Sequence, residues 1–446
     1  MRTGSLDYAA AVEELRARGR FGISLGIERV RAILALTGDP HLELRGALVA
    51  GTNGKGSVVA LARSVLTDVG RRVGTMPKPH LVSYRERIAV DGTPIAPEAF
   101  AAAIGRVLPA VDEIAARLGA PTEFEVLTAA AFGELARRGV DLALIEVGLG
   151  GRLDATNVLD PGVAVVTTVQ HDHERYLGHT LREIGGEKAA IIKPGNLAVT
   201  GAAGRGLRPI LDRCAELGVP LRRAGAGQAY YAEIRDSGWD GLVVDLVTPA
   251  GTLRDLHIGL LGRHQGANAA TAVALLDALV DDAKRRAQPL TIDEAALRRG
   301  LAGARWPGRL ELLRATRMGD VLLDGAHNPA GARALAVALG DLGLRGFPLV
   351  LGATRGKRVA GILRALAPLE PMPIFTRIDD PSAMDPARIL DAWRRIHSGG
   401  GSVVEQPAAA LTRAAEMRRG DEPLVVAGSL YLVGAVRGML ADEVTQ

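Results

Sequence analysis

Short runs of apolar residues alternate along the chain with longer stretches in which apolar residues recur at helical spacing. The runs "GALVAG", "DLALIEVGLGG" and "GVAVVTTV" have the length and continuity of strands that are buried on both faces. The stretches "SVVALARSVLTDVG" and "TLREIGGEKAAIIK" are typical of the helices that connect such strands. This alternation of predicted strands and helices predicts an α/β fold with a parallel sheet and helices on both sides.

The alternation of strands and helices stops after about residue 229. There the short runs "YYAEI", "GLVVDLV" and "LRDLHIGL" are separated by turn residues and predict a small antiparallel flap. The alternation resumes with "DVLLDG", "FPLVLGAT", "MPIFTRI" and "PLVVAGSLY", each followed by a helical stretch. Between the two parts, Trp306-Pro307-Gly308 interrupts any regular element. We therefore expect a first domain over residues 1–302, a linker over 303–309 and a second α/β domain over 310–446.

Composition and charge exclude several classes of protein. Of the 446 residues, 48% are hydrophobic and 23% are charged, which is ordinary for a globular domain. The net charge of +4 is small and the arginines are scattered, so we expect no nucleic-acid partner. Cys214 stands alone, which excludes a disulfide framework. The first 19 residues lack the apolar core of a secretory signal, and no apolar run is long enough to cross a membrane. We expect a monomeric cytoplasmic enzyme.

The stretch "VAGTNGKGSVV" (residues 49–59) departs from the P-loop pattern GxxxxGK[ST]. Val49 stands where that pattern has its first glycine, and Gly56 separates Lys55 from Ser57. A strand, a glycine-rich turn and a helix N-terminus still direct backbone N–H groups and a helix dipole at one spot, which favours an anion. Lys55 would supply charge for the β- and γ-phosphates, and Ser57 a hydroxyl for Mg²⁺. The alternative is a tight turn with a surface lysine.

The motif "GTNGKGS" is similar to the ATP-binding loop of the Mur ligase superfamily and, within it, to the loop of folylpolyglutamate synthase and dihydrofolate synthase. Eight further stretches resemble blocks of that family in the family's order and extend the resemblance over nearly the whole chain: "PHLVSYRERIAVDG", "FEVLTAAAF", "EVGLGGRLDATNV", "HDHERYLGHTLREIGGEKAAIIKPG", "GRHQGANAATA", "WPGRLE", "LDGAHNP" and "AGSLY". The resemblance implies a Mur-ligase-type ATP-binding domain with a P-loop-type parallel sheet over 1–302. It implies a Rossmann-like ligase domain over 310–446.

The family's reaction implies an ATP-dependent amide ligase that adds L-glutamate to reduced folates, and also to dihydropteroate. ATP would phosphorylate the substrate carboxylate, and the amino group of glutamate would attack the acyl phosphate. The resemblance implies ATP and Mg²⁺ as cofactors, because the transferring phosphoryl group needs charge neutralisation. Two alternatives stay open: a Mur-type amino-acid ligase with a different carboxylate substrate, and a nucleotide-binding regulator without ligase activity.

The family's ATP contacts carry over to a set of residues from both halves of the chain: Gly51, Thr52, Asn53, Gly54, Lys55, Gly56, Ser57, Asn268, Arg309 and Asp324. The implied catalytic residues are Lys55, Lys188 and His173. The implied Mg²⁺ ligands are Ser57, Glu146, His173 and Lys188. Glu146 also ends a predicted parallel strand, at the edge where open α/β sheets bind ligands.

Two of these residues have alternative interpretations. Lys188 would be carbamylated by CO₂ in the manner of relatives, which requires a neutral amine; otherwise it is an ordinary lysine on a helix surface. His173 is either a Mg²⁺ ligand or a hydrogen-bonded loop histidine. A zinc site built from His171, His173 and His179 is a further alternative, although no cysteine accompanies them.

The resemblance places the pteridine end of the substrate near Phe124, Glu125 and Asp154. Phe124 would offer a face for ring stacking, unless it only packs in the core. Asp154 would accept hydrogen bonds from pterin N–H groups through both oxygens. His327 and Ser429 follow later strands and are expected near the glutamate substrate.

The chain departs from the family pattern at one position. Family members typically have Ser-Pro-His-Leu where this chain has Lys78-Pro79-His80-Leu81, and the family serine helps to bind a magnesium ion. A protonated lysine cannot ligate Mg²⁺, since the ammonium has no free lone pair. Either Ser57 and the phosphates hold the ion without it, or the Lys78 ammonium replaces part of its charge, or activity is reduced.

Overall fold

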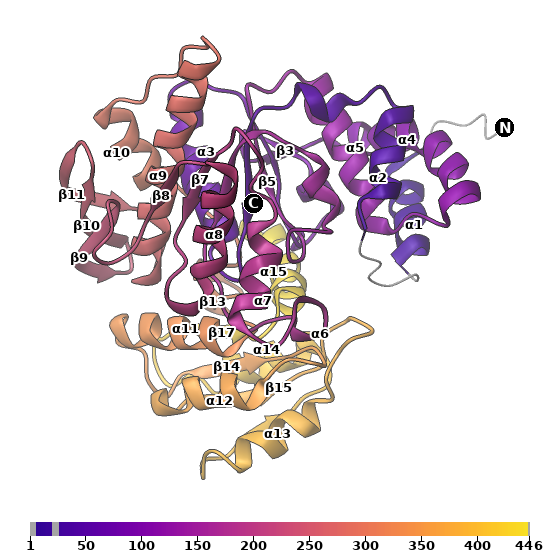
Figure 1. Cartoon of the computed structure of the whole chain (residues 1–446). Coiled ribbons are helices and arrows are strands. Elements are labelled where there is room, and N and C mark those ends of the chain that lie inside the picture. Colours follow the sequence, from indigo (N-terminus) through magenta and orange to yellow (C-terminus); the bar gives the residue numbers. More distant parts are fainter. Residues whose placement is uncertain (1–5, 20–25, 445–446) are drawn as a thin grey trace. The chain divides into compact units, whose positions relative to one another are not determined.

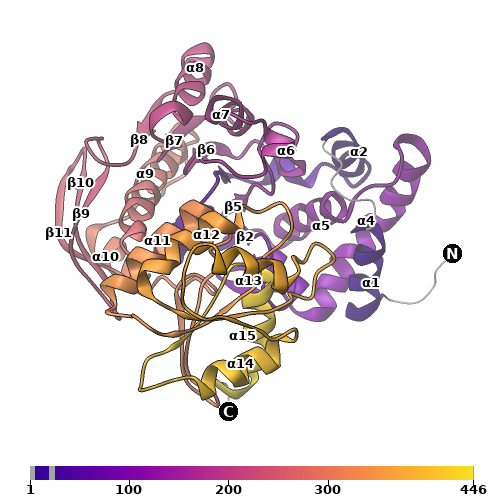
Figure 2. The same ribbon diagram turned by 90° about the horizontal axis from the view of Figure 1, so that it is seen from below.

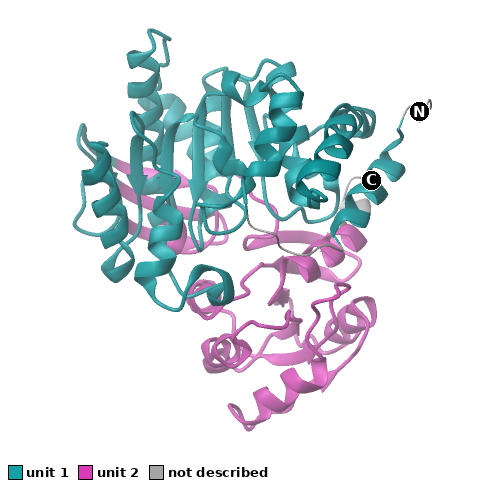
Figure 3. Cartoon of the chain, turned by 45° about the vertical axis from the view of Figure 1, so that its right-hand side comes forward, with its two compact units in different colours: residues 1–232, 246–253, 267–304 teal, residues 233–245, 254–266, 305–446 magenta. Residues whose placement is uncertain are grey.

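The computed structural model describes residues 6–19 and 26–444. The chain divides into two compact units, which Figure 3 colours separately. The first unit comprises residues 1–232, 246–253 and 267–304, and the second comprises residues 233–245, 254–266 and 305–446. Each unit has its own sheet and its own hydrophobic core.

The first unit is built on an eight-stranded sheet (Figure 1). Six neighbouring strands are parallel, as the apolar runs predict, and β3 and β4 add an antiparallel edge. In spatial order the strands are β4 (Thr93–Pro94), β3 (Ala89–Val90), β2 (Val73–Met76), β5 (Leu142–Glu146), β1 (Gly46–Ala50), β6 (Gly162–Val166), β7 (Leu197–Thr200) and β8 (Leu221–Arg223).

Helices cover both faces of this sheet, because successive strand residues point to opposite faces and both faces are apolar. One core joins alternate strand residues, such as Leu48 and Ala50, to α1 (Tyr8–Gly19), α2 (Glu28–Leu36), α4 (Pro97–Leu118), α5 (Glu123–Arg137), α7 (Leu181–Ala189) and α8 (Arg208–Leu217). Helix α3 (Lys55–Asp68) packs against β1, β2, β5 and α10 (Glu294–Gly303). The short α6 (Glu174–Leu177) precedes α7, and α9 (His264–Arg285) precedes α10.

A three-stranded sheet forms the predicted flap, in the order β11-β10-β9. Its strands are β9 (Tyr231–Gly238), β10 (Gly241–Thr248) and β11 (Gly251–Ile258). Only two residues connect each strand to the next, so both pairs are antiparallel, because a parallel pair needs a long crossover.

The second unit holds a six-stranded sheet of β12 (Glu311–Thr316), β13 (Gly319–Leu323), β17 (Leu424–Ala427), β14 (Pro348–Leu351), β15 (Met372–Phe375) and β16 (Ser402–Val403), in that order. All neighbours are parallel except the β12–β13 pair at one edge. One core includes α11 (Pro329–Asp341), α12 (Val359–Leu366) and α13 (Pro386–Arg394). Figure 2 labels these three helices. Helices α14 (Pro407–Glu416) and α15 (Leu430–Val444) complete the unit and contact β14 and β17, respectively.

None of the helices in the described ranges combines the length and the apolar character that a bilayer crossing requires.

Candidate functional site

Four parallel strands of the first unit end side by side and bring polar residues together. In the order β2-β5-β1-β6, these strands are neighbours in one sheet. Strand β1 leads into the glycine loop, β5 ends at Glu146, β2 leads to Lys78, and β6 leads into residues 167–170. Val49 of β1 pairs directly with Glu146 of β5. The predicted phosphate loop and the predicted carboxylate therefore share the edge at which open α/β sheets bind ligands.

Two glycines of the loop are required by its geometry. Gly51 has a φ of 151°, and a Cβ atom there would overlap Oγ1 of Thr167. Gly54 has a φ of 87°, in the left-handed region, and a Cβ atom there would lie 2.5 Å from Oδ1 of Asn268. Asn268, from α9, therefore lies directly against the turn that precedes α3.

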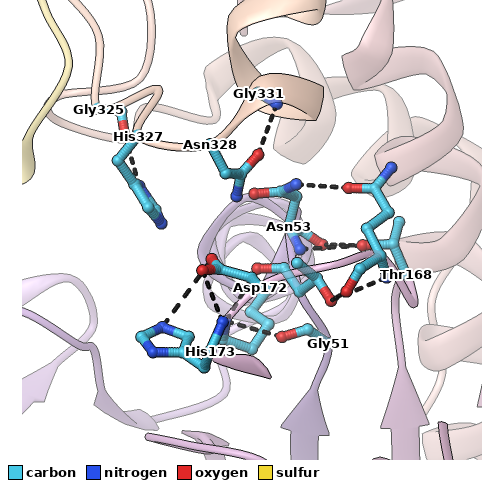
Figure 4. A network of polar contacts seen from close by, with 12 residues as sticks. Gly51, Asn53, Thr168, Asp172, His173, Gly325, His327, Asn328 and Gly331 are labelled. Atoms are coloured by element: carbon cyan, nitrogen blue, oxygen red, sulfur yellow. Dashed lines mark hydrogen bonds and ion pairs between the residues drawn. The ribbon is translucent and has the colours of Figure 1, made fainter. Parts of the chain in front are cut away.

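The loop is fixed by hydrogen bonds to the segment that follows β6 (Figure 4). The N–H of Thr52 donates to the carbonyl of Thr168 at 2.8 Å, and the N–H of Asn53 donates to Oγ1 of Thr168 at 2.9 Å. The side-chain amide of Asn53 donates to Oε1 of Gln170 at 2.6 Å, and Oγ1 of Thr167 donates to the carbonyl of Asn53 at 2.7 Å. These two N–H groups are thus already used, whereas the N–H groups in the first turn of α3 are available to an anion, as at the N-terminus of any α-helix.

Lys55 begins α3, and its ammonium points back over the loop. The Nζ atom donates to the carbonyl of Gly51 at 3.0 Å and lies 3.7 Å from Oε1 of Glu146. The other oxygen of Glu146 accepts a hydrogen bond of 3.3 Å from the N–H of Lys78. Ser57, in the first turn of α3, and Glu146 are each only 5% exposed. One buried carboxylate therefore joins the phosphate loop to the segment that contains Lys78.

Lys78, Phe124 and Asp154 surround Gly148. The Lys78 ammonium lies 3.9 Å from the centre of the Phe124 ring, so it covers one face of that ring. A Cβ atom at Gly148 would lie 2.5 Å from Nζ of Lys78, 2.8 Å from Cζ of Phe124 and 2.9 Å from Oδ2 of Asp154. Phe124 and Asp154, which are predicted to bind the pteridine, therefore lie next to Lys78, the residue at which this chain departs from the family pattern.

The carboxylate of Asp154 already accepts three hydrogen bonds from the chain. Oδ2 accepts from the N–H of Leu149 at 2.7 Å, and Oδ1 accepts from the N–H and Oγ1 of Thr156 at 3.1 and 2.6 Å. A carboxylate has about four acceptor sites, so only part of its capacity is left for a ligand.

Glu125 caps the helix that contains Phe124. Its Oε2 accepts from the N–H and Oγ1 of Thr122 at 2.7 and 2.8 Å, while Thr122 in turn caps the N–H of Glu125. Arg29 also binds this carboxylate, with Nε 3.0 Å from Oε1. Glu125 therefore orients the first turn of α5, where Phe124 lies, and its own oxygens are engaged.

Lys188 is a buried residue and not a helix-surface lysine. It is 3% exposed on α7. Burial and, after it, the nearby charge of Lys55 together lower the pKa of Lys188 to about 7, against the opposing effect of nearby carboxylates. The amine is therefore substantially neutral near pH 7, which carbamate formation requires.

His173 caps α6 with a left-handed backbone, at a φ of 50°. Its side chain is 43% exposed, and its Nε2 lies 3.9 Å from Oδ2 of Asp172 (Figure 4). Within the described ranges, no three His, Cys, Asp or Glu side chains are grouped as metal ligands, so the zinc alternative from His171, His173 and His179 has no site. The oxygens of Ser57 and Glu146 do suit Mg²⁺, which is usually held by one or two carboxylates, waters and substrate phosphates.

In the second unit, Asp324 directly follows β13 and holds in place the segment that immediately precedes β12. Its Oδ2 accepts from the N–H of Leu310 at 2.9 Å, and its Oδ1 accepts from the N–H of Ala326 at 2.8 Å. A Cβ atom at Gly325 would lie 2.8 Å from Nη1 of Arg309, so Arg309 and Asp324 occupy the same corner.

His327 and Ser429 follow β13 and β17, which are parallel neighbours. Nδ1 of His327 is hydrogen-bonded to the carbonyl of Gly325 at 2.8 Å (Figure 4). Ser429 is 3% exposed, and its Oγ accepts from the N–H of Tyr431 at 3.2 Å. Asn328, which the sequence did not single out, caps α11 by accepting from the N–H of Gly331 at 2.8 Å.

Comparison with known proteins gives matches over nearly the whole chain. The Mur ligase middle domain matches residues 49–276, and the dihydrofolate synthetase C-terminal domain matches residues 310–439. The chain is 33% identical over 437 residues to the dihydrofolate synthase/folylpolyglutamate synthase of Bacillus subtilis, covering 97% of this chain and 99% of that protein. It is 32% identical over 415 residues to the Escherichia coli protein of the same name, covering 93% and 91%.

Solved structures agree with these matches. Mycobacterium tuberculosis folylpolyglutamate synthase complexed with ADP and AMPPCP superposes with a TM-score of 0.87 at 32% identity, covering 97% of this chain and 99% of that one. Escherichia coli FolC in complex with DHPP and ADP superposes with a TM-score of 0.85 at 30% identity, covering 99% of each chain.

Proposed function

Because the chain belongs to the folylpolyglutamate synthase/dihydrofolate synthase family of Mur ligases, and is an ATP-dependent ligase of folates and glutamate, we propose that it activates the substrate carboxylate as an acyl phosphate. A carboxylate oxygen forms a bond to the γ-phosphorus as ADP leaves. The amino group of L-glutamate then attacks the acyl carbon, and phosphate leaves with the oxygen that came from the substrate.

One observation supports this reaction most directly. Glu146 contacts both the ammonium of Lys55, at the phosphate loop, and the N–H of Lys78, whose side chain covers Phe124. A nucleotide on the glycine loop and an aromatic substrate against Phe124 would therefore have their reacting groups on either side of this carboxylate. Phosphoryl transfer depends mainly on such positioning and on charge stabilisation.

In the proposed ATP site, the first turn of α3 donates N–H groups to the phosphates and Lys55 supplies a positive charge. Asn268 borders the loop at Gly54. Thr52 and Asn53 act by holding the loop to residues 167–170, since their N–H groups are occupied there. Arg309 and Asp324 are proposed ATP contacts from the second unit. Residues 303–309 are proposed as the linker between domains 1–302 and 310–446.

Magnesium is proposed as the metal, held by Ser57, Glu146, His173 and carbamylated Lys188 together with substrate phosphates. When bound, it would neutralise charge on the transferring phosphoryl group. The Lys188 amine would react with CO₂ and lose a proton, which converts a cation into an oxygen ligand. Its burial and lowered pKa support this role.

We assign the substrate side to Phe124, Asp154 and Glu125, with Glu125 acting through the cap that fixes Phe124. His327 and Ser429 are proposed for L-glutamate. We further propose that the protein accepts both dihydropteroate and reduced folates, because the Bacillus subtilis and Escherichia coli relatives carry both activities in their names. By contrast, the Lacticaseibacillus casei relative, which is 32% identical, is named only folylpolyglutamate synthase, without the dihydrofolate synthase activity.

The acyl phosphate can be tested by isotope transfer. With dihydropteroate labelled by ¹⁸O in both carboxylate oxygens, one labelled oxygen should appear in each phosphate released, as detected by mass spectrometry. Unlabelled phosphate formed together with the amide product would exclude an acyl phosphate.

A further inference from the structure

Lys193 fastens the turn that contains Asp154 to the rest of the first unit. It lies between α7 and β7 and is partly buried. Its ammonium donates to Oδ1 of Asn157 at 3.0 Å and to the carbonyl of Leu159 at 2.6 Å. Hydrogen bonds from a charged donor are stronger than those between neutral groups, and partial burial shields them from water. One lysine therefore holds two positions of the chain that follows Asp154.

Asn157 extends this attachment to both sides of the turn. It is buried, and its backbone N–H donates to the carbonyl of Asp154 at 2.9 Å. Its side-chain amide donates to the carbonyls of Arg152 at 3.2 Å and of Ala190 at 3.5 Å. Its Oδ1 accepts from Lys193, whose ammonium can only donate. Asn157 thus connects the start of the turn to the segment that follows α7.

The start of the turn also lies directly against α7. A Cβ atom at Gly151 would lie 2.5 Å from the carbonyl oxygen of Glu187 and 3.2 Å from Cα of Lys188. The N–H of Arg152 donates to the same carbonyl of Glu187 at 2.9 Å. Backbone meets backbone here, so the turn has no room to move towards α7. The hydrogen bonds of Lys193 and Asn157 act in the opposite direction and keep the turn from moving away.

The carboxylate of Asp154 takes its orientation from this turn. Oδ1 accepts from the N–H and Oγ1 of Thr156, and Oδ2 accepts from the N–H of Leu149. Both partners lie close to Asp154 in sequence, so the carboxylate moves with the turn. Oδ2 accepts once and keeps the larger remaining capacity. A Cβ atom at Gly148 would lie 2.9 Å from this oxygen and 2.8 Å from Cζ of Phe124, so Oδ2 is the oxygen nearest to a ligand against that ring.

We propose that Lys193 is a positioning residue for the pteridine of the substrate, because it holds the turn in which Oδ2 of Asp154 faces the space beside Phe124. This inference rests on the proposed function, in which Asp154 accepts hydrogen bonds from N–H groups of the pteridine. Lys193 acts through Asn157 and Asp154. Its contribution to substrate binding therefore depends on the carboxylate of Asp154.

The test is a double-mutant cycle that measures binding of pteroate, in buffer with ADP and Mg²⁺ and without glutamate, so that no turnover occurs. The four proteins are the wild type, Asp154→Asn, Lys193→Met and the double variant. Lys284→Met is the control at an exposed lysine. Titration calorimetry measures each Kd, and circular dichroism checks that each variant is folded. If Lys193→Met does not fold, Asn157→Ser takes its place, since it removes one acceptor of Lys193.

We expect Asp154→Asn to weaken pteroate binding about 10- to 100-fold, as for loss of a charge-assisted hydrogen bond. Lys193→Met should weaken it about 10-fold, Lys193→Arg should restore part of the loss, and Lys284→Met should bind like the wild type. The double variant should bind within about twofold of Asp154→Asn, because a displaced carboxylate and an absent one have the same effect. In turnover, Lys193→Met should raise KM for dihydropteroate more than it lowers kcat.

Two outcomes would overturn the inference while leaving the proposed function intact. One is a Lys193→Met variant that binds pteroate as tightly as the wild type. The other is a double variant whose loss equals the product of the two single losses, which would make Lys193 a structural residue that acts independently of Asp154. An Asp154→Asn variant with unchanged affinity would instead contradict the proposed pteridine site, and this inference with it. A wild type that does not bind pteroate would contradict the proposed substrate class.

Discussion

Asn268 and Gly54 lie so close that a single added carbon atom would not fit between them: a Cβ atom at Gly54 would be 2.5 Å from Oδ1 of Asn268. This contact joins α9 to the glycine loop, although the two positions are more than two hundred residues apart in sequence. The loop needs glycine at position 54 for two reasons: the backbone has a left-handed φ of 87°, and the side-chain amide of Asn268 leaves no room for a Cβ atom.

Gly54→Ala should therefore damage nucleotide binding and not only stability. Gly70 provides a matched control, because its φ of 76° is also left-handed while nothing lies within 4 Å of its added Cβ. We expect each variant to lose about 1 kcal/mol of unfolding free energy from backbone strain. Only Gly54→Ala should also weaken ATP binding, by about tenfold or more, since Asn268 must move. Equal ATP affinity in the two variants would contradict the assigned loop.

Lys55→Ala should remove a positive charge from the transferring phosphoryl group. The expected loss of kcat is roughly a hundredfold or more, corresponding to a few kcal/mol of barrier. Thermal unfolding should change little, since the contacts of the ammonium with the described residues are those with loop carbonyls and Glu146. Lys284→Ala, at a lysine whose side chain is 72% exposed, is the control and should keep normal turnover. Near-normal kcat for Lys55→Ala would show that another residue serves the phosphates.

Much of the fold could be predicted because the central strands are continuous apolar runs. Several strands that sequence reasoning missed lie at sheet edges and are short, such as β8 (Leu221–Arg223) and β16 (Ser402–Val403). Strand β2 was missed as well, although it lies inside the first sheet between β3 and β5. An edge strand is paired on one side only, so its composition carries a weak signal. The antiparallel partner β12 was likewise not predicted, since the first strand expected in the second domain was "DVLLDG".

The site could be predicted only where its residues are close in sequence. The glycine loop is local, and so is the capping box from Thr122 to Glu125, whose T-x-x-E spacing was a readable signal that was missed. The burial of Lys188 and the contact of Lys78 with Phe124 depend on packing between distant elements. Nothing in the local sequence around either lysine distinguishes it from a solvent-exposed one.

Lys188→Ala should abolish most turnover and be partly rescued by a short carboxylic acid that fills the vacated space. With ¹³CO₂, the wild type should give a carbamate carbon signal in NMR spectra that Lys188→Ala lacks. The signal should weaken below about pH 7, because the pKa of Lys188 is lowered to about 7 and acid converts the amine to the unreactive ammonium. An active wild type with no carbamate signal would exclude the modification.

Glu134 should make the first unit sensitive to acid. It is fully buried on α5 and accepts hydrogen bonds from Arg137 and Arg138, as well as from Arg106 of α4. Burial alone would raise the pKa of Glu134, but Arg137 and Arg138, at the end of α5, lower it overall below 4.5. Its stabilising contribution is therefore complete above pH 4.5 and is lost as pH falls through the lower pKa of the folded state.

Glu134→Gln should lower the free energy of urea unfolding by about 1–3 kcal/mol at pH 7 and flatten its decline below pH 4.5. Glu113→Gln, at an exposed ion pair with Arg117 on α4, should change stability by less than about 0.5 kcal/mol. An unchanged pH profile in Glu134→Gln would mean that this cluster does not hold α5, and hence Phe124, in place.

The most direct measurement offers the purified protein ATP, Mg²⁺ and radiolabelled L-glutamate, with dihydropteroate or tetrahydrofolate as the acceptor. The expected result is labelled glutamate in an amide product with each acceptor, one phosphate released per glutamate added, and no phosphate release when either glutamate or the acceptor is omitted. Lys55→Ala should give almost no product under the same conditions. Glutamate incorporation into neither acceptor, with phosphate release that depends on a different carboxylate, would contradict the assignment of this protein as a folate ligase.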